Sequence, residues 1–399
     1  MQQQTFVIVG ASLAGAKAAE TLRAEGFDGR VVLVGAESER PYERPPLSKD
    51  YLRGEAGREK VYVHEDGFYE ENEIELRLRT SIAAIDAAAQ EAVFESGERL
   101  GYDRLLLATG ATPRKLEVPG HHLEAIHYLR DVEDSDVLRA RLDAGSGHVV
   151  VIGAGWIGAE VAASARMKGL DVTLVEMTEV PLERVLGSQL GEIYRDIHVE
   201  HGVDFRGSVA LERFEGGGAV ERVVLADGSS IECDFVVVGV GVVPRVQVAE
   251  ASGIAVENGV LVNEKLEASV PGVFAAGDVA NAWHPFFEER IRVEHWANAL
   301  NQGPAAARNM LGADEPYERL PYFFSDQYDV GMEYSGYATD WDEVVLEGDV
   351  VAREFIAYWL RRGRVVAGMN VNVWDVTETI QEQIRSGVRT PAGASRETP

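Results

Sequence analysis

At 399 residues the chain is long enough for two or three domains, and a hydrophobic content of 46% can fill their cores, which excludes wholesale disorder. The 38 Lys and Arg against 66 Asp and Glu give a formal net charge of −28, which argues against nucleic acid or an anionic membrane surface as a partner. The single cysteine, Cys233, cannot form an intrachain disulfide, a redox-active thiol pair or an all-cysteine metal site, so we expect no metal.

The N-terminus runs directly from Met-Gln-Gln-Gln into the apolar stretch of residues 5–9, without a basic segment or a cleavable apolar region. The longest nearly uncharged apolar run, residues 235–244, is too short to span a bilayer and predicts one buried strand. Together with the single cysteine, these features predict a cytoplasmic protein.

An internal repeat dominates the chain. Residues 6–37 and 149–176 each read as an apolar strand, a glycine-rich turn, an alanine-rich helix, a glycine break, a second apolar strand and a terminal acid. This pattern predicts the same βαβ unit of a parallel sheet twice. Small residues at four-residue spacing, such as Ala14 and Ala18, would let the first helix lie close on its sheet.

The second repeat carries a complete dinucleotide fingerprint, Gly153-x-Gly155-x-x-Gly158. Gly153 permits the tight turn, Gly155 leaves room for a pyrophosphate, and Gly158 lets helix and strand pack closely. Glu176 follows at the end of the next strand, where a carboxylate can bind both ribose hydroxyls. The structural alternative is a tight strand–helix turn with no ligand.

The first repeat departs from the fingerprint, because it reads Gly10-x-Ser12-x-x-Gly15. Serine stands where the pyrophosphate would pass and needs slightly more room than glycine. Glu37 and the second complete site downstream favour nucleotide binding here too. Two dinucleotide sites in one chain suggest a flavin and a nicotinamide cofactor, since hydride transfer needs a donor and an acceptor.

From about residue 321 the pattern changes to alternating strands, which we expect at residues 343–347, 354–359 and 365–370. Arg361, Arg362 and Gly363 predict a hairpin turn between the last two. Asp375 with Glu378 predicts a capping box for a helix that Gly387 ends, and a frayed tail follows.

Six motifs occur in this order: residues 10–15, PYERPPLSK at 41–49, ATG at 108–110, GAGWIGAE at 153–160, AAGD at 275–278 and SDQY at 325–328. The set resembles the FAD-dependent, NADH-using ferredoxin reductases, which include putidaredoxin, rhodocoxin and biphenyl-dioxygenase ferredoxin reductases. RPPLSK and SDQY are the motifs most specific to this group, and the resemblance covers about residues 5–385.

The resemblance implies an α/β fold with two Rossmann-like dinucleotide-binding domains in a glutathione-reductase-like arrangement, plus a C-terminal α+β domain. The FAD-binding domain would be discontinuous, at residues 1–112 and 244–316. The NADH-binding domain would span residues 113–243, and the C-terminal domain, with its tail, residues 317–399.

The resemblance also implies which residues contact FAD. They are Gly10, Ser12, Leu13, Ala14, Gly15, Glu37, Arg44, Lys49, Ile82, Ala108, Thr109, Gly110, Arg130, Gly277, Asp278, Glu294, His295 and Trp296. Three have structural alternatives: Lys49 as a surface lysine, Asp278 as a turn cap and Trp296 as a core aromatic residue.

For NADH the resemblance implies Gly153, Gly155, Ile157, Gly158, Glu160, Glu176, Arg184, Val240 and Gly241, with a solvated Arg184 as one alternative. Lys49 and Glu160 would be the catalytic residues: Glu160 would pair with Lys49 and meet the nicotinamide, and Lys49 would lie near the reactive flavin edge. In the implied reaction NADH reduces FAD by hydride transfer, and electrons then leave singly to a ferredoxin-type iron–sulfur protein that serves an oxygenase.

The residues before SDQY and the cysteine content both bear on the electron acceptor. Tyr322 and Phe324 stand before SDQY, where the family often has tryptophans. The RPPLSK segment also lacks the cysteine that NADH peroxidases need, and the chain lacks the cysteine pair of disulfide reductases. Electrons should therefore leave the flavin without a thiol intermediate, and Cys233 is interpreted as structural.

Several readings of the function stay open. A flavin NADH oxidase or quinone reductase would use the same sites without a protein acceptor. A non-enzymatic NADH-sensing flavoprotein, similar in fold to apoptosis-inducing factor, is a different class, and a Rossmann dehydrogenase without flavin is a third. For the ferredoxin reductase we expect a monomer or weak dimer whose partner docks at a basic position, with Arg308 preferred over the arginines at 361–364.

Overall fold

The computed structural model describes residues 3–388, which form two compact units. The first unit contains the chain up to residue 43, residues 58–112 and residues 243–321. The second contains residues 44–57, residues 113–242 and the chain from residue 322 onward. β8 (Ala111–Pro113) and β17 (Val242–Pro244) lie where the chain passes between the units. The division into an FAD domain and an NADH domain stays a prediction.

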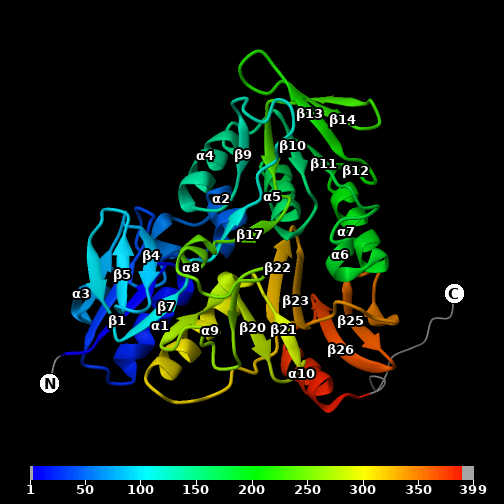
Figure 1. Cartoon of the computed structure of the whole chain (residues 1–399). Helices are drawn as coiled ribbons and strands as arrows, with labels where there is room; N and C mark the ends of the chain where they lie inside the picture. The colour runs from blue at the N-terminus through cyan, green and yellow to red at the C-terminus, as the bar shows by residue number, and fades with distance from the viewer. Residues whose placement is uncertain (1–2, 389–399) are drawn as a thin grey trace. The chain divides into compact units, whose positions relative to one another are not determined.

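A five-stranded parallel sheet forms the centre of the first unit (Figure 1). Its spatial order is β19 (Val273–Ala275), β7 (Arg104–Leu107), β1 (Thr5–Val9), β2 (Arg30–Val34) and β3 (Ile74–Arg77). β19, β7, β1 and β2 are nearly continuous apolar runs, as expected for a parallel sheet covered on both faces, whereas the edge strand β3 carries the charged Glu75 and Arg77. The sheet order reverses between β1 and β7, and α/β sheets bind ligands at such a switch point.

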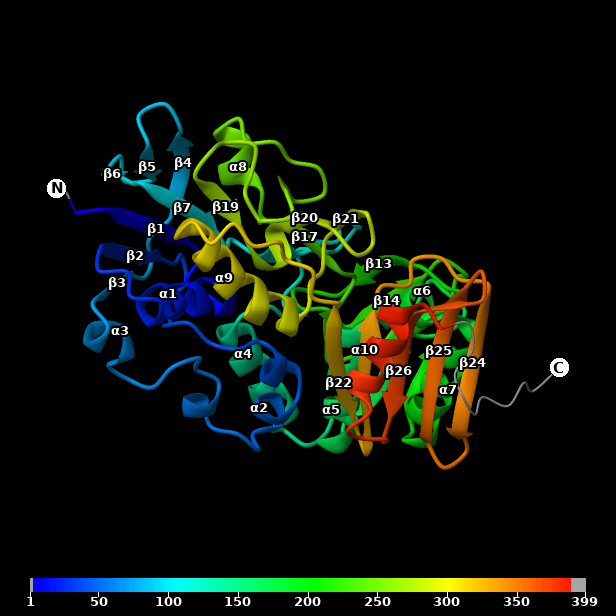
Figure 2. The ribbon, with the colours of Figure 1, turned by 90° about the horizontal axis from the view of Figure 1, so that it is seen from below.

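Helices α1 (Leu13–Ala24) and α9 (Trp296–Met310) pack closely in the first unit, side by side in Figure 2. Ala14, Ala18 and Leu22 are buried on α1, which confirms the small-residue face expected from the repeat. A Cβ on Gly303 of α9 would lie 2.2 Å from the carbonyl oxygen of Ala14. Only glycine therefore allows this close approach of the two helices.

Two smaller sheets complete the first unit. β4 (Ile82–Asp86), β5 (Glu91–Phe94) and β6 (Arg99–Gly101) form an antiparallel sheet, and β18 (Val260–Val262), β20 (Ala280–His284) and β21 (Glu289–Ile291) form another three-stranded sheet. The short helices are η2 (Arg58–Lys60), α3 (Phe68–Glu71), α8 (Gln247–Ala251) and η3 (Gly277–Val279).

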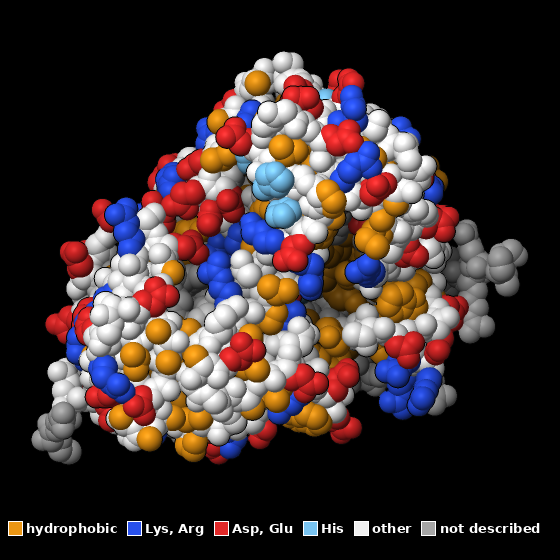
Figure 3. All heavy atoms as spheres, turned by 45° about the horizontal axis from the view of Figure 1, so that its top comes forward, with side chains coloured by type: hydrophobic (Ala, Val, Ile, Leu, Met, Phe, Trp, Pro, Cys, Tyr) orange, Lys and Arg blue, Asp and Glu red, His pale blue; other side chains and the backbone are white. Residues whose placement is uncertain are grey.

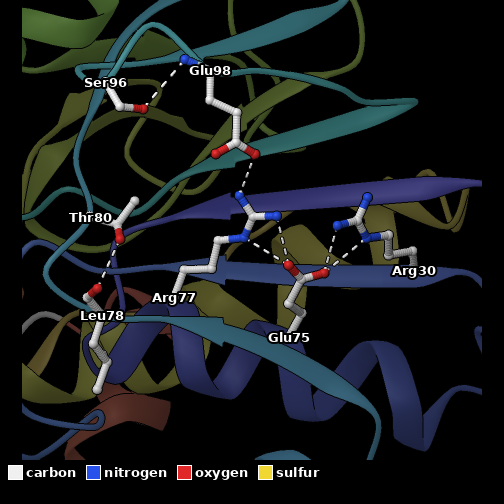
Figure 4. A network of polar contacts seen from close by, with 7 residues as sticks. All are labelled: Arg30, Glu75, Arg77, Leu78, Thr80, Ser96 and Glu98. Carbon is white, nitrogen blue, oxygen red and sulfur yellow. Dashed lines mark hydrogen bonds and ion pairs between the residues drawn. The ribbon is translucent and has the colours of Figure 1, made fainter.

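Charged side chains tie the sheet edge to its neighbours (Figure 4). Glu75 on β3 accepts two hydrogen bonds from Arg30 of β2, at 2.9 and 2.7 Å, and one from Arg77 at 2.7 Å. Arg77 also donates to Glu98, 2.8 Å away, beside β6. These groups are partly exposed, so each pair contributes little by itself, and the network mainly fixes the register of β2 and β3.

The second unit repeats the topology of the first. Its parallel sheet has the order β12 (Asp204–Arg206), β11 (Asp171–Val175), β10 (His148–Ile152), β16 (Phe235–Val238) and β9 (Ile126–Tyr128). In both sheets the strand before the glycine turn is central, the next strand lies on one side, and the order reverses toward the other. This confirms the repeat predicted from the sequence.

The remaining elements of this Rossmann-like part are helical or at its periphery. They are η1 (Pro45–Ser48), α2 (Asp50–Arg53), α4 (Val132–Leu142), α5 (Trp156–Met167), α6 (Glu183–Leu186) and α7 (Ser188–Glu200), with a small antiparallel sheet of β13 (Leu211–Glu215), β14 (Arg222–Leu225) and β15 (Ser230–Glu232). One prediction is wrong here: residues 235–244 form two strands, β16 and β17, because the glycines at 239 and 241 interrupt the apolar run.

An antiparallel sheet forms the C-terminal part of the second unit, in the order β22 (Tyr322–Gln327), β23 (Val330–Gly336), β26 (Arg364–Val371), β25 (Glu354–Arg361) and β24 (Glu343–Asp349). One face packs on α6 and α7 around the buried Trp359 and Tyr194. The other packs on α10 (Thr377–Ser386), where Ile380 lies against Gly368.

The hairpin predicted at residues 361–363 is confirmed, since Arg362 and Gly363 both have positive φ angles, of 52° and 71°. Gly387 ends α10 in the left-handed conformation, also as predicted. The capping box is wrong: Asp375 is itself left-handed, at φ 62°, and Val376 occupies the N-cap without a side-chain hydrogen bond. The predicted tail lies almost entirely outside the described residues.

Among residues 3–388 no helix is both long and apolar enough to cross a membrane. The same residues hold no group of three or more His, Cys, Asp or Glu side chains placed to bind a metal ion. Figure 3 shows blue Lys and Arg side chains interspersed with red Asp and Glu side chains on one face of the protein. The negative net charge therefore does not make this face uniformly acidic.

Candidate cofactor-binding sites

The first glycine turn joins β1 to α1 in the first unit. Gly10 has a φ of +123°, and a Cβ there would lie 2.0 Å from the carbonyl oxygen of Ala108. A Cβ on Gly15 would lie 2.0 Å from the carbonyl oxygen of Gly10. Both glycines are therefore required by the backbone itself, as the fingerprint predicts.

The second glycine turn, between β10 and α5 of the second unit, has matching geometry. Gly153 has a φ of +96°, and a Cβ on Gly158 would lie 1.9 Å from the carbonyl oxygen of Gly153. A Cβ on Gly155, by contrast, would meet no described atom within 4 Å. The middle position of the turn borders open space, which a pyrophosphate could occupy at the N-terminus of α5.

The middle position explains why serine is accepted in the first turn. Ser12 is the counterpart of Gly155 and serves as the N-cap of α1, with an extended backbone at φ −125°. Its side chain makes no capping hydrogen bond with the described residues, and neither helix has an acidic residue in its first turn. Both helix N-termini therefore suit an anionic group, which fits one dinucleotide in each unit.

Most of the other predicted FAD residues of the first unit lie at the carboxyl edge of its parallel sheet or at α9. Ala108, Thr109 and Gly110 follow β7, Glu37 follows β2, Gly277 and Asp278 follow β19, Ile82 begins β4, and Glu294, His295 and Trp296 lead into α9. Hydrogen bonds fix several of them: Thr109 Oγ1 donates to the carbonyl oxygen of Arg245 at 2.7 Å, and Gln302 Oε1 accepts from the backbone N–H of Gly277 at 2.9 Å.

Two side chains near the start of α9 have shifted pKa values. Burial lowers the pKa of His295 to about 4, although Asp278 acts in the opposite direction, so this imidazole is neutral near pH 7. Burial raises the pKa of Glu43, against the effect of the Trp296 indole. Glu43 was not among the predicted site residues; its position in PYERPPLSK, beside Arg44, was the only available signal.

Three predicted FAD residues, Arg44, Lys49 and Arg130, belong to the second unit. The guanidinium of Arg44 donates a hydrogen bond to the backbone carbonyl oxygen of Arg130. The segment from residue 44 to 57 is anchored there by further bonds, including one of 2.5 Å from Tyr51 to Asp136. Their contacts with FAD stay predictions.

Glu176 stands at the end of β11, beside the second glycine turn. Its carboxylate accepts hydrogen bonds from the backbone N–H groups of Ala154 at 2.7 Å, Met177 at 2.7 Å and Thr178 at 3.2 Å. Oε1 accepts two of these bonds and Oε2 one, so they hold the carboxylate at the turn and leave Oε2 a further lone-pair direction. The arrangement fits a ribose diol and repels a 2′-phosphate.

We therefore expect a higher kcat/KM with NADH than with NADPH. Glu176→Ala should reduce the ratio of these two values about tenfold, or by about 1.4 kcal/mol. Glu179 and Glu183 follow Glu176, and no basic residue occurs before Arg184. The measurement is kcat/KM for both coenzymes in the two proteins. Equal efficiencies in the unmodified protein would contradict the role of Glu176.

The predicted Lys49–Glu160 pair is present in the second unit. Lys49 Nζ lies 3.0 Å from Glu160 Oε1, and both side chains are largely buried. Glu160 points from α5, the helix that begins at the second glycine turn, and Lys49 links η1 to α2. Buried opposite charges next to a nucleotide turn can orient a bound nicotinamide without exchanging protons.

The other predicted NADH residues lie around the same turn. Ile157 is 45% exposed in the first turn of α5, and Val240 and Gly241 follow β16 at the sheet edge. Arg184 is exposed on α6. Their contacts with NADH stay predictions, as does the solvated alternative for Arg184.

The sequence interpretation missed Ser48 and Ser325 as neighbours of Glu160. Ser48 Oγ lies 2.5 Å from Glu160 Oε2, and Ser325 Oγ lies 2.8 Å from Glu160 Oε1. Both serines belong to the motifs most specific to the resemblance, RPPLSK and SDQY. That position was a usable signal, although the sequence does not reveal their common partner.

Cys233 lies between β15 and β16 and packs against the core of the second unit. Burial, assisted by Asp234, raises the pKa of its thiol to about 12, so the reactive thiolate is not populated near neutral pH.

Cys233→Ser should leave the NADH-dependent reduction of ferricyanide or cytochrome c essentially unchanged, because no electron passes through the thiol. The flavin content of the variant is the control. Collapse of turnover with flavin still bound would reveal a thiol intermediate.

Comparisons with known proteins agree with this geometry. The chain matches the family model described as pyridine nucleotide-disulphide oxidoreductase over residues 4–303, and the model described as reductase C-terminal over residues 322–397. It is 39% identical over 377 residues to the ferredoxin–NAD(+) reductase component of the anthranilate 1,2-dioxygenase system from Burkholderia cepacia, covering 94% of this chain and 92% of that protein.

Two further relatives bear on the acceptor. The chain is 36% identical over 372 residues to putidaredoxin reductase from Pseudomonas putida, covering 92% of this chain and 88% of that protein. Its structure is similar to that in the covalent putidaredoxin reductase–putidaredoxin complex, with a TM-score of 0.91, 34% identity and coverage of 97% and 94%.

Proposed function

Because the chain belongs to the pyridine nucleotide-disulphide oxidoreductases, as a ferredoxin reductase that uses FAD and NAD(H), we propose that it passes electrons from NADH through FAD to a ferredoxin that serves an oxygenase. The observation that carries the proposal is the buried Lys49–Glu160 pair on the helix that begins at a complete dinucleotide turn. A second nucleotide turn of the same topology in the same chain supplies the second cofactor site.

The side chains of the protein bind and orient in this reaction. The turn at residues 153–158 binds the NADH pyrophosphate, Glu176 binds the adenosine ribose, and the Lys49–Glu160 pair orients the nicotinamide end. Bound FAD would supply the redox chemistry, because a flavin can take two electrons from NADH and release them one at a time to an iron–sulfur protein. The neutral His295 adds no positive charge at the start of α9, so the helix N-terminus provides the favourable potential there.

The ferredoxin acceptor is proposed from the relatives, two of which are named for ferredoxin or putidaredoxin reduction. The absence of a second cysteine supports an acceptor that takes electrons from the flavin without a thiol. The cytoplasmic location and the monomeric or weakly dimeric state stay predictions from the sequence.

The test is a steady-state assay of the purified protein, which we expect to be yellow, against a panel of ferredoxins, with oxygen and quinones as competing acceptors. We expect about one FAD per chain, released on denaturation, and NADH oxidation that depends on ferredoxin. Undiminished oxygen or quinone turnover without ferredoxin would favour the NADH oxidase or quinone reductase. Slow turnover with a long-lived NADH complex would favour an NADH sensor, and a colourless protein would favour a dehydrogenase without flavin.

Arg308 is the position proposed for the contact with ferredoxin. It lies in the last turn of α9, is partly exposed, and forms an ion pair with Glu315 at 3.8 Å, a distance at which the pair is weak. Arg308→Glu should raise the KM for ferredoxin about tenfold at low salt and flatten its salt dependence, while sparing ferricyanide reduction. Arg195→Glu on α7, another partly exposed arginine, is the matched control. If Arg308→Glu weakens ferredoxin reduction and ferricyanide reduction equally, or weakens neither, Arg308 is not part of the interface.

A further inference from the structure

Glu160 is a buried carboxylate whose two oxygens are both hydrogen-bonded. The residue is 4% exposed and lies on α5. Its Oε2 accepts from Ser48 Oγ at 2.5 Å, and its Oε1 accepts from Lys49 Nζ at 3.0 Å and from Ser325 Oγ at 2.8 Å. Three donors offset much of the cost of burying this charge.

The bond from Ser325 continues into a chain of buried side chains. Gln327, next but one on β22, donates from Nε2 to Ser325 Oγ at 3.3 Å. His198 of α7 lies with Nε2 2.9 Å from Gln327 Oε1, and with Nδ1 3.1 Å from the hydroxyl of Tyr328. Ser325, Gln327 and His198 are each at most 1% exposed, so water does not compete for these bonds.

The donor and acceptor capacities of these side chains give the hydrogen-bond chain a single direction. The Ser325 hydroxyl donates to the carboxylate, so its oxygen accepts from the Gln327 amide nitrogen. The amide oxygen of Gln327 then faces His198, which must carry its proton on Nε2 and accept from Tyr328 on Nδ1. Burial lowers the pKa of His198 to about 4, so near pH 7 the ring holds the single proton that this pattern needs. Every donated hydrogen points toward Glu160, and aligned bonds strengthen one another.

A second carboxylate lies within electrostatic reach of Lys49. Asp326 follows Ser325 on β22 and interacts electrostatically with both Lys49 and Glu160. Lys49 has a long side chain and also lies over the ring of Phe324, 5.4 Å from its centre. Without a fixed Glu160, the ammonium could turn to Asp326 and leave the position that the nicotinamide needs. The buried Tyr194 also interacts electrostatically with both carboxylates, and Arg53 and Asp50 act on Asp326 as well.

We propose that Ser325, held by Gln327 and His198, is a positioning residue that fixes the Glu160 carboxylate so that Lys49 pairs with it rather than with Asp326. This inference rests on the proposed function for its effect on the NADH reaction. The hydrogen-bond chain itself is a property of the second unit and can be tested without NADH.

The rate experiment is stopped-flow reduction of the FAD-loaded protein by NADH. Ser325→Ala should slow the limiting rate about tenfold while changing the Kd for NADH less than about twofold, because the bond to a charged group is lost without loss of a nucleotide contact. Ser325→Thr keeps the hydroxyl and should restore most of the rate. Ser335→Ala is the matched control: Ser335 is equally buried on the neighbouring strand β23 and bonds Gln381 instead.

Coupling to Glu160 is tested by a double-mutant cycle. In a Glu160→Gln background, Ser325→Ala should slow the limiting rate by less than about threefold, since the charged acceptor is already absent. The Tm values of four FAD-loaded proteins complete the cycle: the unmodified protein, Ser325→Ala, Glu160→Gln and the double variant. The Tm of the double variant should be at least about 2 °C higher than the sum of the two single shifts predicts.

The outcomes separate the inference from the function on which it rests. If the Tm shifts of Ser325→Ala and Glu160→Gln are additive, the proposed hydrogen-bond chain is refuted. Equal losses of rate in Ser325→Ala and Ser335→Ala, or a full Ser325→Ala effect in the Glu160→Gln background, would overturn the positioning role. Failure of NADH to reduce the flavin of the unmodified protein would instead refute the proposed function, and the Tm cycle would still decide whether Ser325 holds Glu160.

Discussion

Replacing Glu160 by glutamine should slow the reduction of bound FAD by NADH about a hundredfold while leaving the flavin in place. The substitution keeps the shape of the side chain but removes the negative charge 3.0 Å from Lys49 Nζ. A factor of one hundred corresponds to about 2.7 kcal/mol of lost transition-state stabilisation, which is ordinary for one preorganised charge in a buried site. Lys49→Met should act in the same direction. The measurement is stopped-flow reduction by NADH, with flavin content as the control.

The free energy of unfolding separates a chemical role of the Lys49–Glu160 pair from a merely structural one. Lys49→Met leaves the buried Glu160 charge without its counter-ion and should cost about 3–5 kcal/mol of unfolding free energy, whereas Glu160→Gln should cost less because Asp326 remains near Lys49. The double variant Lys49→Met/Glu160→Gln removes both charges and should recover much of that stability, yet not the rate. If reduction by NADH is unchanged in both single variants, the pair does not act on the nicotinamide.

Gly158→Ala and Gly155→Ala should produce opposite defects in the second glycine turn. A Cβ at Gly158 would lie 1.9 Å from the carbonyl oxygen of Gly153, so the helix must move. We expect a loss of about 3 kcal/mol, or roughly 6–12 °C in Tm. A Cβ at Gly155 meets open space in the protein, so Tm should change little, whereas the affinity for NADH should fall about tenfold because the methyl group occupies the pyrophosphate path.

The measurements are thermal unfolding and NADH binding for both variants. Ser12 provides an internal comparison, since it shows that the fold accepts a side chain at the middle position of such a turn. Unchanged NADH affinity in Gly155→Ala would mean that the pyrophosphate does not pass this residue. A Gly158→Ala protein as stable as the unmodified one would contradict the close packing of α5 on its sheet.

Local rules predicted most of the two βαβ units that carry the glycine turns. Gly10, Gly15, Gly153 and Gly158 are required by backbone contacts within the same βαβ unit, so their spacing alone indicated the turns. The repeated sheet order followed from the same units. The ion pair of Lys49 with Glu160 required the family resemblance, because 111 positions separate the two residues.

The sequence did not reveal features that depend on distant partners or on backbone conformation. Ser325 and Ser48 come from separate segments and meet only at Glu160, so neither motif alone indicates the contact. Residues 235–244 contain one continuous apolar pattern, yet glycines at 239 and 241 divide them into two strands. Asp375 matched a capping sequence but adopts a left-handed backbone, which places the N-cap at the next residue.

The most direct test of the account is an anaerobic titration of the FAD-loaded protein and excess ferredoxin with NADH. Each NADH supplies two electrons, and each ferredoxin with a one-electron iron–sulfur cluster accepts one. The account predicts two reduced ferredoxins per NADH oxidised, with NADPH far less effective and with the same stoichiometry in Cys233→Ser. NADH oxidation that leaves every ferredoxin tested oxidised, while oxygen or a quinone is reduced at full rate, would contradict it.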